Sequence, residues 1–389
     1  MGEQSIEFSI FLIFTGAAVF ATAALYARQA MIVAYILLGL IMGPWGMGFV
    51  NDAELISDIS NIGIIFLLYL LGMDLLPQQL WQMLREAVVV TLTSSIIFCI
   101  VGFIIGFIFG YELFQALLIG AVMMFSSTII GLKLLPTTTL HHKHTGQIII
   151  SVLLIQDLIA IIILLLLQGY GKGGNLMVDI ASQLLYLPVL IGVVYLFAHF
   201  ILFKLILRFD QIHEYIFLLA IAWCLGIAEL AYYVGLSHEI GAFVAGVTLA
   251  SSPIALFITE RLKPLRDFFL VIFFFSLGAG FNLSVVNDII IPASILAILA
   301  LILKPLIFSR LLQMEGENKS VSLESGFRLG QISEFSLLIA VLAVKSGFID
   351  DDTSYLIQLA TLITFVISSY VIVLKYPTPI SVSDRLRRD

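Results

Sequence analysis

The apolar run QIIISVLLIQDLIAIIILLLL, residues 147–167, constrains the fold of this chain more than any other segment. A helix of about 20 residues crosses the roughly 30 Å apolar layer of a bilayer, and this run holds 21 residues. Asp157 is the eleventh of them, so its carboxylate is predicted near the bilayer midplane. A charge there costs about 2.5–3.5 kcal/mol on insertion scales, and such residues often mark ion or proton pathways. The alternative is a protonated or paired structural acid inside a helix bundle.

The composition extends this prediction to the whole chain. Hydrophobic residues make up 61% of the 389 residues, charged residues make up 12%, and the mean hydropathy is +1.11. A soluble core cannot absorb that much apolar surface, so the fold class is an all-α polytopic membrane protein. The net charge of −7 comes without a basic patch, so no nucleic-acid partner is expected. Cys99 and Cys224 lie in apolar spans without metal-ligand spacing, so the sequence predicts no cofactor in this chain.

Thirteen candidate membrane spans follow from the apolar runs. They are residues 6–26, 31–50, 55–76, 87–110, 113–135, 147–167, 183–207, 215–234, 239–251, 268–283, 289–312, 326–344 and 356–375. The longest polar break, residues 313–324, is too short to fold alone. Residues 1–389 are therefore expected to form a single transmembrane transporter domain.

Loop charges give the expected orientation. The first span has the acidic flank MGEQSIE and no cleavage site, so it is predicted to be a retained helix with its N-terminus outside. Only Lys172 and Lys345 then fall on outer flanks, while Lys304 and Arg328 lie within or at the edge of spans. The cytoplasmic flanks hold Arg28, Arg85, Lys133, Lys143, Lys204, Arg208, Arg261, Lys263, Arg266, Arg310, Lys319, Lys375, Arg385, Arg387 and Arg388. This bias obeys the positive-inside rule and makes the C-terminus cytoplasmic.

The span order favours an inverted repeat. Spans seven apart cross the membrane in opposite directions, as in many secondary transporters built from two inverted halves. The fifth span contains FSSTIIG, residues 125–131, and its partner, the twelfth, contains GQISEFS, residues 330–336. These polar interruptions predict two crossing discontinuous helices, whose free ends carry partial charges that Lys304, Glu334 and Arg328 could neutralise. Alternatively, the helices are continuous and the hydroxyl side chains merely bond the backbone of their own helix. The residues in question are Ser126, Ser127, Thr128 and Ser333.

The candidate ion site is built around Asp157, which could bind either a proton or a metal cation, K+ or Na+. Gln156 beside it adds a neutral amide that could also be a cation ligand. Ser127 and Thr128 in the predicted break supply hydroxyl oxygens. The sequence therefore predicts a cation/proton-binding site of four residues.

Six blocks of the chain, in order, resemble the monovalent cation/proton antiporters, and within them the Kef-type potassium/proton antiporters of the glutathione-gated potassium efflux family. The blocks are GPWGMGFV (43–50), LYLLGMDL (68–75), MMFSSTIIGLKLL (123–135), LLIQDLIAI (153–161), SHEIGAFVAGVTLASSP (237–253) and LKPLRDFFLVIFFFSLGAGFNL (262–283). The resemblance covers nearly the whole chain. It implies a sodium/proton-antiporter-like fold and a homodimer in the lipid of a bacterial inner membrane.

The resemblance also implies a division of labour. Dimerisation would involve roughly residues 1–84 and 213–285, ion transport roughly residues 85–167 and 289–375, and residues 183–207 would form a linker helix. Cation and proton would compete for Asp157 while the transport part moves across the membrane. Lys304 matches a buried basic residue that pairs with the aspartate in some relatives, and its alternative role is to extend to the cytoplasmic surface.

Two features depart from the Kef pattern or stand outside it. Kef-type proteins usually continue into a cytoplasmic nucleotide-binding domain, and this chain has no GxGxxG in a βαβ context. A separate regulatory subunit, or a C-terminal regulatory domain outside this chain, is therefore expected. His141, His142 and His144 lie in the loop after the fifth span. Three roles are open: an ordinary polar loop, a pH sensor, or a metal site. Against the metal site, the sequence shows no carboxylate near these histidines.

The predicted function is secondary antiport of a monovalent cation, K+ favoured, against H+ by alternating access. We expect electroneutral exchange, because Gln156 is neutral where some relatives carry a second acid. The alternatives are a Na+/H+ antiporter of the same fold and a channel-like potassium efflux pathway. Against the channel, the sequence contains no TVGYG-like selectivity filter. It also contains no HExxH motif of the kind that an intramembrane metalloenzyme would need, so no enzyme is predicted.

Overall fold

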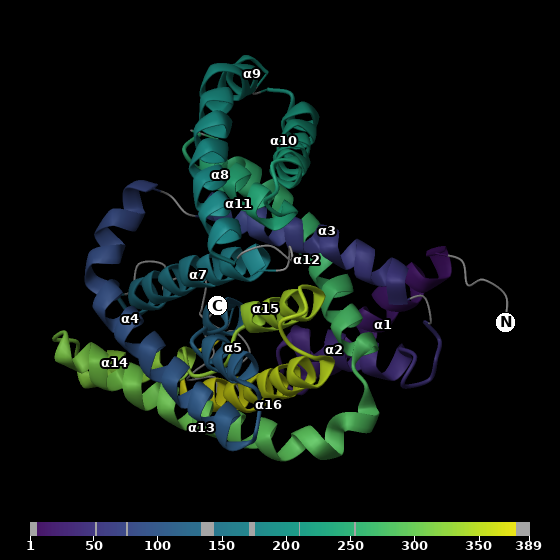
Figure 1. Ribbon diagram of the computed structural model, residues 1–389, viewed down its shortest axis with the longest axis vertical. Coiled ribbons are helices and arrows are strands. Elements are labelled where there is room, and N and C mark those ends of the chain that lie inside the picture. The colour runs from purple at the N-terminus through teal and green to yellow at the C-terminus, as the bar shows by residue number, and fades with distance from the viewer. Residues whose placement is uncertain are drawn as a thin grey trace. The chain divides into compact units, whose positions relative to one another are not determined.

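The computed structural model describes residues 6–50, 53–74, 77–133, 144–170, 176–209, 211–252 and 254–378 (Figure 1). Each of the predicted spans has a helical counterpart among these residues. In chain order the elements are α1 (Ile6–Tyr26), α2 (Met31–Met42), α3 (Ala53–Asp74), α4 (Pro77–Ile108), α5 (Leu113–Met123), α6 (Thr128–Lys133), α7 (His144–Tyr170), α8 (Leu176–Phe197), the π-helical turn η1 (Ala198–Leu202), α9 (Phe203–Arg208), α10 (His213–Tyr233), α11 (His238–Ala250), α12 (Ala255–Gly280), the 3-10 turn η2 (Leu283–Val285), α13 (Val286–Met314), α14 (Lys319–Arg328), α15 (Glu334–Lys345) and α16 (Asp351–Lys375). The prediction of an all-helical multi-span protein is confirmed.

Three predicted helix boundaries were wrong for identifiable reasons. The second span was expected to reach Val50, but α2 ends at Met42, because Pro44 follows and Gly48 adopts a positive φ of 67°. Helix α4 begins at Pro77 rather than Ala87, and proline fits the first position of a helix. Helix α12 begins at Ala255 rather than Phe268, because its first part carries charges that interrupt the apolar run. Apolar runs alone therefore locate spans better than helix ends.

The two predicted discontinuities are confirmed. The fifth span is divided into α5 and α6, with residues 124–127 between them outside helical structure. The twelfth span is divided into α14 and α15, separated by residues 329–333. We call residues 124–127 the first break and residues 329–333 the second break.

The chain divides into two compact units. The first contains residues 1–14, 38–80 and 165–280, and the second contains residues 15–37, 81–164 and 281–389. The dimerisation, transport and linker roles predicted from the sequence stay predictions. Residues 15–37 group with the second unit, whereas the predicted division assigned them to the dimerisation part.

In the first unit, α3 packs against α11 and α12, and α10 packs against α11. Small residues allow the close approach, because a Cβ added at Gly246 of α11 would lie 2.0 Å from the carbonyl oxygen of Tyr69 in α3. The Trp223 indole of α10 donates to the carbonyl of Ala245 in α11 at 3.1 Å. Backbone contact through glycine thus sets the spacing of these helices.

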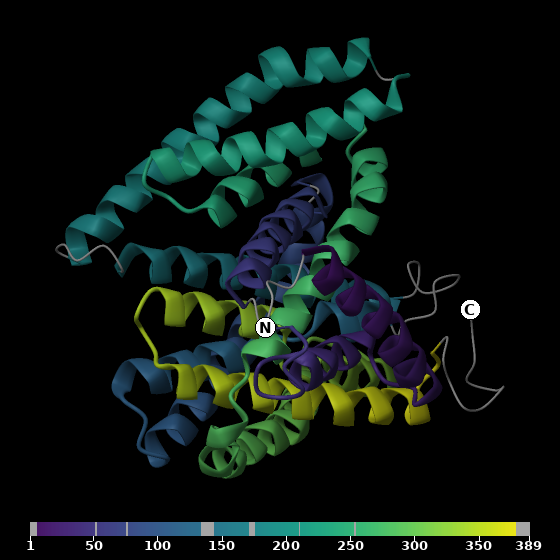
Figure 2. The ribbon, with the colours of Figure 1, turned by 90° about the vertical axis from the view of Figure 1, so that its right-hand side faces the viewer.

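In the second unit, α13 packs along both α14 and α16, and α15 packs against α16 and α5 (Figures 1 and 2). The yellow helices α15 and α16 are joined by a short loop and run beside each other in both views. Both breaks belong to this unit, as does the part of α7 that carries Asp157. The second unit therefore contains the predicted ion site.

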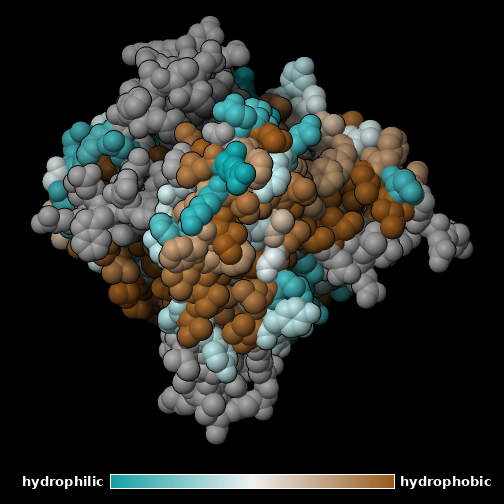
Figure 3. All heavy atoms as spheres, turned by 90° about the horizontal axis from the view of Figure 1, so that it is seen from above, coloured by the Kyte–Doolittle hydropathy of each residue, from teal (hydrophilic) through white to brown (hydrophobic). Residues whose placement is uncertain are grey.

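The exposed sides of the helices are apolar and buried positions include polar side chains, which is the reverse of the pattern in a soluble protein. In α4 the exposed positions Leu92, Ile96 and Ile100 alternate with the buried hydroxyl residues Thr91 and Ser94. Figure 3 shows hydrophobic side chains over much of the visible face. Seven helices within the described ranges are long and apolar enough to cross a membrane by length and composition. This pattern is that of a bundle whose solvent is lipid.

Candidate functional site

The first break follows the end of α5, and its last residue, Ser127, caps the N-terminus of α6. Ser127 precedes α6, and its Oγ accepts a hydrogen bond from the Ile130 N–H at 3.1 Å. Its carbonyl accepts from the Gly131 N–H at 3.0 Å. Serine is favoured at this position because it satisfies an N–H that has no helical partner. Ser127 of the FSST segment thus caps a new helix after the break, and the span is not one continuous helix.

The second break has a similar local design. Ser333 precedes α15 and its Oγ accepts from the Phe335 N–H at 3.0 Å. Glu334 is the first residue of α15 and is 5% exposed. An acidic side chain is favourable in the first turn of a helix, where the macrodipole is positive. This placement agrees with the expected charge compensation by Glu334, which stays a prediction.

Lys304 of α13 connects the two breaks. Its Nζ donates to the carbonyl of Phe125 at 2.6 Å and to the carbonyl of Gln331 at 2.9 Å. The same ammonium lies 5.4 Å from the centroid of the Phe98 ring, a cation–π contact. Lys304 is 0% exposed, so the alternative in which it extends to the cytoplasmic surface is wrong. One cation therefore serves carbonyls from both discontinuous helices.

Further hydrogen bonds hold the breaks against each other. The Ser126 Oγ donates to the Leu329 carbonyl at 2.9 Å. The Ser336 Oγ of α15 donates to the Val122 carbonyl of α5 at 2.7 Å. Both carbonyls lie near the ends of half-helices, where the backbone lacks helical partners. The crossing is therefore a hydrogen-bonded unit assembled from segments about 200 residues apart in the sequence.

Helix α7 brings Gln156 and Asp157 to this crossing. The Gln156 Oε1 accepts from the Ser126 N–H at 3.0 Å, and its Nε2 donates to the Met124 carbonyl at 2.9 Å. Gln156 is 1% exposed and Asp157, directly after it, is 4% exposed. The amide expected to ligate a cation is thus engaged with the backbone of the first break. Asp157 is held next to that break because its neighbour is clamped there.

The two hydroxyls proposed as cation ligands differ in their availability. The Ser127 oxygen already accepts the Ile130 N–H. The Thr128 Oγ1 is buried and has no hydrogen-bond partner within the described part of the chain. Thr128 is therefore the better candidate for a second oxygen ligand beside Asp157.

Arg328 is wholly buried at the C-terminal end of α14. Its Nε donates to Glu324 Oε1 at 3.0 Å, and its Nη2 donates to the Pro377 carbonyl at 2.9 Å. A cation in the last turn of a helix is favourable for the macrodipole. Arg328 thus joins α14 to the segment that follows α16.

Gln331 was missed by the sequence analysis. Its Nε2 donates to the Arg328 carbonyl at 2.9 Å and to the Ser127 carbonyl at 3.3 Å. Its Oε1 accepts from the Ser368 Oγ of α16 at 3.0 Å. The signal in the sequence was its position inside GQISEFS, a polar run within an apolar span. Gln331 therefore links the first break, the second break and α16.

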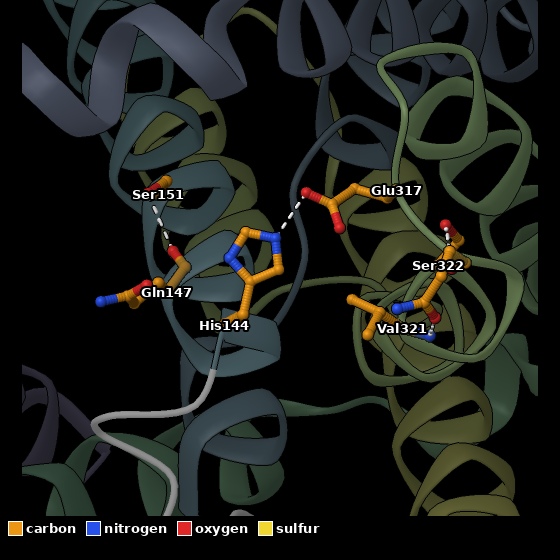
Figure 4. Close-up of polar contacts among 7 residues, drawn as sticks. His144, Gln147, Ser151, Glu317, Val321 and Ser322 are labelled. Carbon is orange, nitrogen blue, oxygen red and sulfur yellow. Dashed lines mark hydrogen bonds and ion pairs between the residues drawn. The ribbon is translucent and has the colours of Figure 1, made fainter.

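Glu317 was also missed. Figure 4 shows the His144 ring at the start of α7 facing Glu317, with Nε2 and Oε1 2.6 Å apart. The sequence had shown no carboxylate near the histidine cluster, and the loop before α14 supplies one. His141 and His142 lie outside the described residues. Among the residues that the structure covers, no group of three His, Cys, Asp or Glu side chains could hold a metal ion.

Comparisons with known proteins agree with this geometry. A family model described as "Sodium/hydrogen exchanger, transmembrane" matches residues 10–374. The K(+) efflux antiporter 4 of Arabidopsis thaliana is 28% identical over 347 residues, which are 86% of this chain and 58% of that protein. This chain therefore spans 58% of the length of that relative.

Two solved structures of the sodium proton antiporter MjNhaP1 from Methanocaldococcus jannaschii share the fold. The structure at pH 8 has a TM-score of 0.70 at 20% identity and covers 93% of this chain and 94% of that one. The electron-microscopy map has a TM-score of 0.65 at 18% identity, with 95% and 96% covered. The architecture of this chain is thus NhaP1-like.

Proposed function

Since the chain belongs to the sodium/hydrogen exchanger family and is a multi-pass cation/proton antiporter, not an enzyme, we propose that it exchanges one K+ for one H+ at Asp157. The observation that carries the proposal is the position of Asp157. It is a buried carboxylate in the middle of a membrane helix, one residue after the amide that clamps that helix to the first break. As the second oxygen ligand we propose the Thr128 hydroxyl, whose oxygen is buried and has no hydrogen-bond partner among the described residues.

Competition at one carboxylate explains the coupling. A proton or a monovalent cation each neutralises the carboxylate, so only one can be bound at a time. The bare carboxylate is costly to carry through an apolar region, whereas either loaded form is neutral. The site therefore changes sides only when loaded, and net movement of a cation in one direction requires that the site return with a proton. This is alternating access with obligatory exchange.

The engagement of Gln156 supports a stoichiometry of one to one. Its side chain is uncharged, and both its oxygen and its nitrogen are used by the backbone of the first break. Asp157 is then the group that exchanges proton for cation, so one positive charge moves each way per cycle.

Potassium is favoured over sodium by the sequence. The Kef-type blocks and the 28% identity to a protein named K(+) efflux antiporter 4 support K+. The sodium proton antiporters of known structure are 18–20% identical and inform the fold alone. We further propose a homodimer in a bacterial inner membrane, with the N-terminus outside and regulation by a domain or subunit outside this chain.

The test is cation-dependent proton flux in liposomes with K+ or Na+, for the wild type, Asp157→Asn and the control Asp288→Asn. Asp288 lies exposed in the first turn of α13, in the same unit. We expect Asp157→Asn to lose exchange and Asp288→Asn to keep the wild-type rate. The K+ rate should stay constant when the membrane potential is clamped at several values. Wild-type flux in Asp157→Asn would refute the site, faster exchange of Na+ would refute K+, and a rate that rises with voltage would refute the stoichiometry.

A further inference from the structure

We propose that Gln331 is a positioning residue for cation binding, which acts by holding the first break in place beside Asp157. This inference rests on the proposed exchange at Asp157 and adds a residue to it. Gln331 touches neither Asp157 nor Thr128 through any of its three side-chain hydrogen bonds. Its effect on the cation must therefore pass through the backbone that it holds.

The amide of Gln331 has a fixed orientation. Its Nε2 faces two acceptors, the Arg328 and Ser127 carbonyls, and its Oε1 faces a donor, the Ser368 hydroxyl. A flipped amide would bring oxygen against two carbonyls and lose these bonds. Each hydrogen-bonding group of the side chain is used, and the residue is wholly buried. Gln331 is therefore a rigid spacer between three segments.

Gln331 and Gln156 form a matched pair. Gln156 donates to the Met124 carbonyl at the C-terminal end of α5, and Gln331 donates to the Arg328 carbonyl at the C-terminal end of α14. Carbonyls at helix ends lack helical partners and are costly to leave unpaired when buried. Each discontinuous helix thus has its end covered by a neutral amide, while the Lys304 amino group donates to a carbonyl in each break.

The two glutamines bond the backbone of adjacent residues in the first break, each from a different segment of the chain. Gln156 of α7 accepts from the Ser126 N–H, and Gln331 of the second break donates to the Ser127 carbonyl. Thr128, the candidate cation ligand, is the next residue. With the Gln331 amide removed, the Ser126 bonds to Gln156 and to the Leu329 carbonyl remain, but the Ser127 carbonyl loses the side-chain donor that holds it. The Thr128 hydroxyl is then free to shift relative to Asp157.

A cation and a proton respond differently to such a shift. A monovalent cation needs several oxygen atoms at fixed distances, whereas a proton needs only the carboxylate. Loss of the Gln331 amide should therefore weaken cation binding and leave protonation of Asp157 in place. Because the two compete, a tenfold rise in the KM for K+ means that protons must be about tenfold scarcer for the same occupancy. The pH profile of exchange then moves upward by about one unit.

Two pairs of variants provide matched controls. Gln331→Leu removes the amide, and Gln358→Leu removes a buried amide of α16 that, among the residues the structure describes, donates to Ser354 of the same helix at 3.1 Å. Ser368→Ala removes the donor that orients the Gln331 oxygen. Ser369→Ala removes the neighbouring buried hydroxyl, whose Oγ has no partner among the described residues.

The experiment measures K+ dependence, maximal rate and pH profile of proton flux in liposomes. For Gln331→Leu we expect the KM for K+ to rise about tenfold, the fold-change that one buried hydrogen bond supports. The maximal rate should stay within about twofold, and the pH profile should move upward. Ser368→Ala should change KM in the same direction by roughly two- to fivefold. Gln358→Leu and Ser369→Ala should match the wild type.

The outcomes separate the two proposals. If the wild type shows no cation/proton exchange, the proposed function fails. If the wild type exchanges and both Gln331→Leu and Ser368→Ala keep its KM and pH profile, the positioning role fails and the proposed function stands. A fall in maximal rate without a change in KM also overturns it, since that result indicates a structural role. If Gln331→Leu does not fold, Ser368→Ala against Ser369→Ala decides the question alone.

Discussion

Replacement of Lys304 by methionine tests how the two breaks are held together. Methionine keeps the length of the side chain but removes the donor to the Phe125 and Gln331 carbonyls, at 2.6 and 2.9 Å. A buried group left without its partner costs about 1–3 kcal/mol, so two carbonyls cost about 2–6 kcal/mol. The cation–π contact with Phe98 adds roughly 1–2 kcal/mol. Removal of a buried ammonium offsets part of this loss.

We therefore expect Lys304→Met to lower the stability by about 3 kcal/mol, which corresponds to roughly 4 °C in Tm for a chain of 389 residues. The assay is thermal unfolding of the purified protein in detergent, with Lys319→Met as control. Lys319 is exposed at the start of α14, in the same unit, so its replacement should change Tm by less than about 1 °C. Equal Tm values for Lys304→Met and the wild type would refute the assignment of Lys304 as the bridge between the breaks.

Two further predictions concern helix packing and the ion pair between His144 and Glu317. Gly246→Ala should destabilise the first unit by roughly 1–3 kcal/mol, because the added Cβ would lie 2.0 Å from the Tyr69 carbonyl oxygen. In the control Gly226→Ala of α10, the added Cβ meets nothing within 4 Å, so this variant should be neutral or stabilising. Equal thermal unfolding of the two variants would contradict the close packing at Gly246. His144→Ala should lower stability by at most about 1 kcal/mol, because the ion pair that it forms with Glu317 is exposed to solvent. Thermal unfolding of this variant and the wild type at low and high salt checks this, and a loss that stays well above about 1 kcal/mol at high salt would contradict it.

The positions of the discontinuous helices could be predicted from the sequence because local chemistry decides them. Apolar membrane helices seldom tolerate a cluster such as Ser126, Ser127 and Thr128 without a reason, and GQIS repeats the pattern seven spans later. Ser127 and Ser333 then occupy the positions before α6 and α15, where a serine oxygen accepts a backbone N–H. Helix ends at Pro77 and Ala255 were not predicted, since polar residues hide them from a search for apolar runs.

The partners of the site residues could not be predicted, because they come from distant parts of the chain. Ser126 bonds Leu329, 203 positions away, and Lys304 bonds Phe125, 179 positions away. A single sequence shows that Gln331 is polar and lies in a break, but not which carbonyls it meets. The same holds for Glu317, which becomes relevant only where the loop before α14 reaches the start of α7.

The hydrogen bonds of Gln156 to the first break restrict which side chain, neutral or charged, can occupy position 156. From the sequence, a glutamine there reads as a neutral replacement for a second acid, so an acid would simply add a charge to the transport cycle. In the structure the same side chain donates to the Met124 carbonyl and accepts from the Ser126 N–H. An ionised acid could still accept from Ser126, but it has no hydrogen to donate, and its oxygen would face the Met124 carbonyl. A second charge would therefore be incompatible with the present geometry of the first break. The number of charges at the site and the backbone conformation of the discontinuous helix are properties of one arrangement, and a change in stoichiometry would require a change in both.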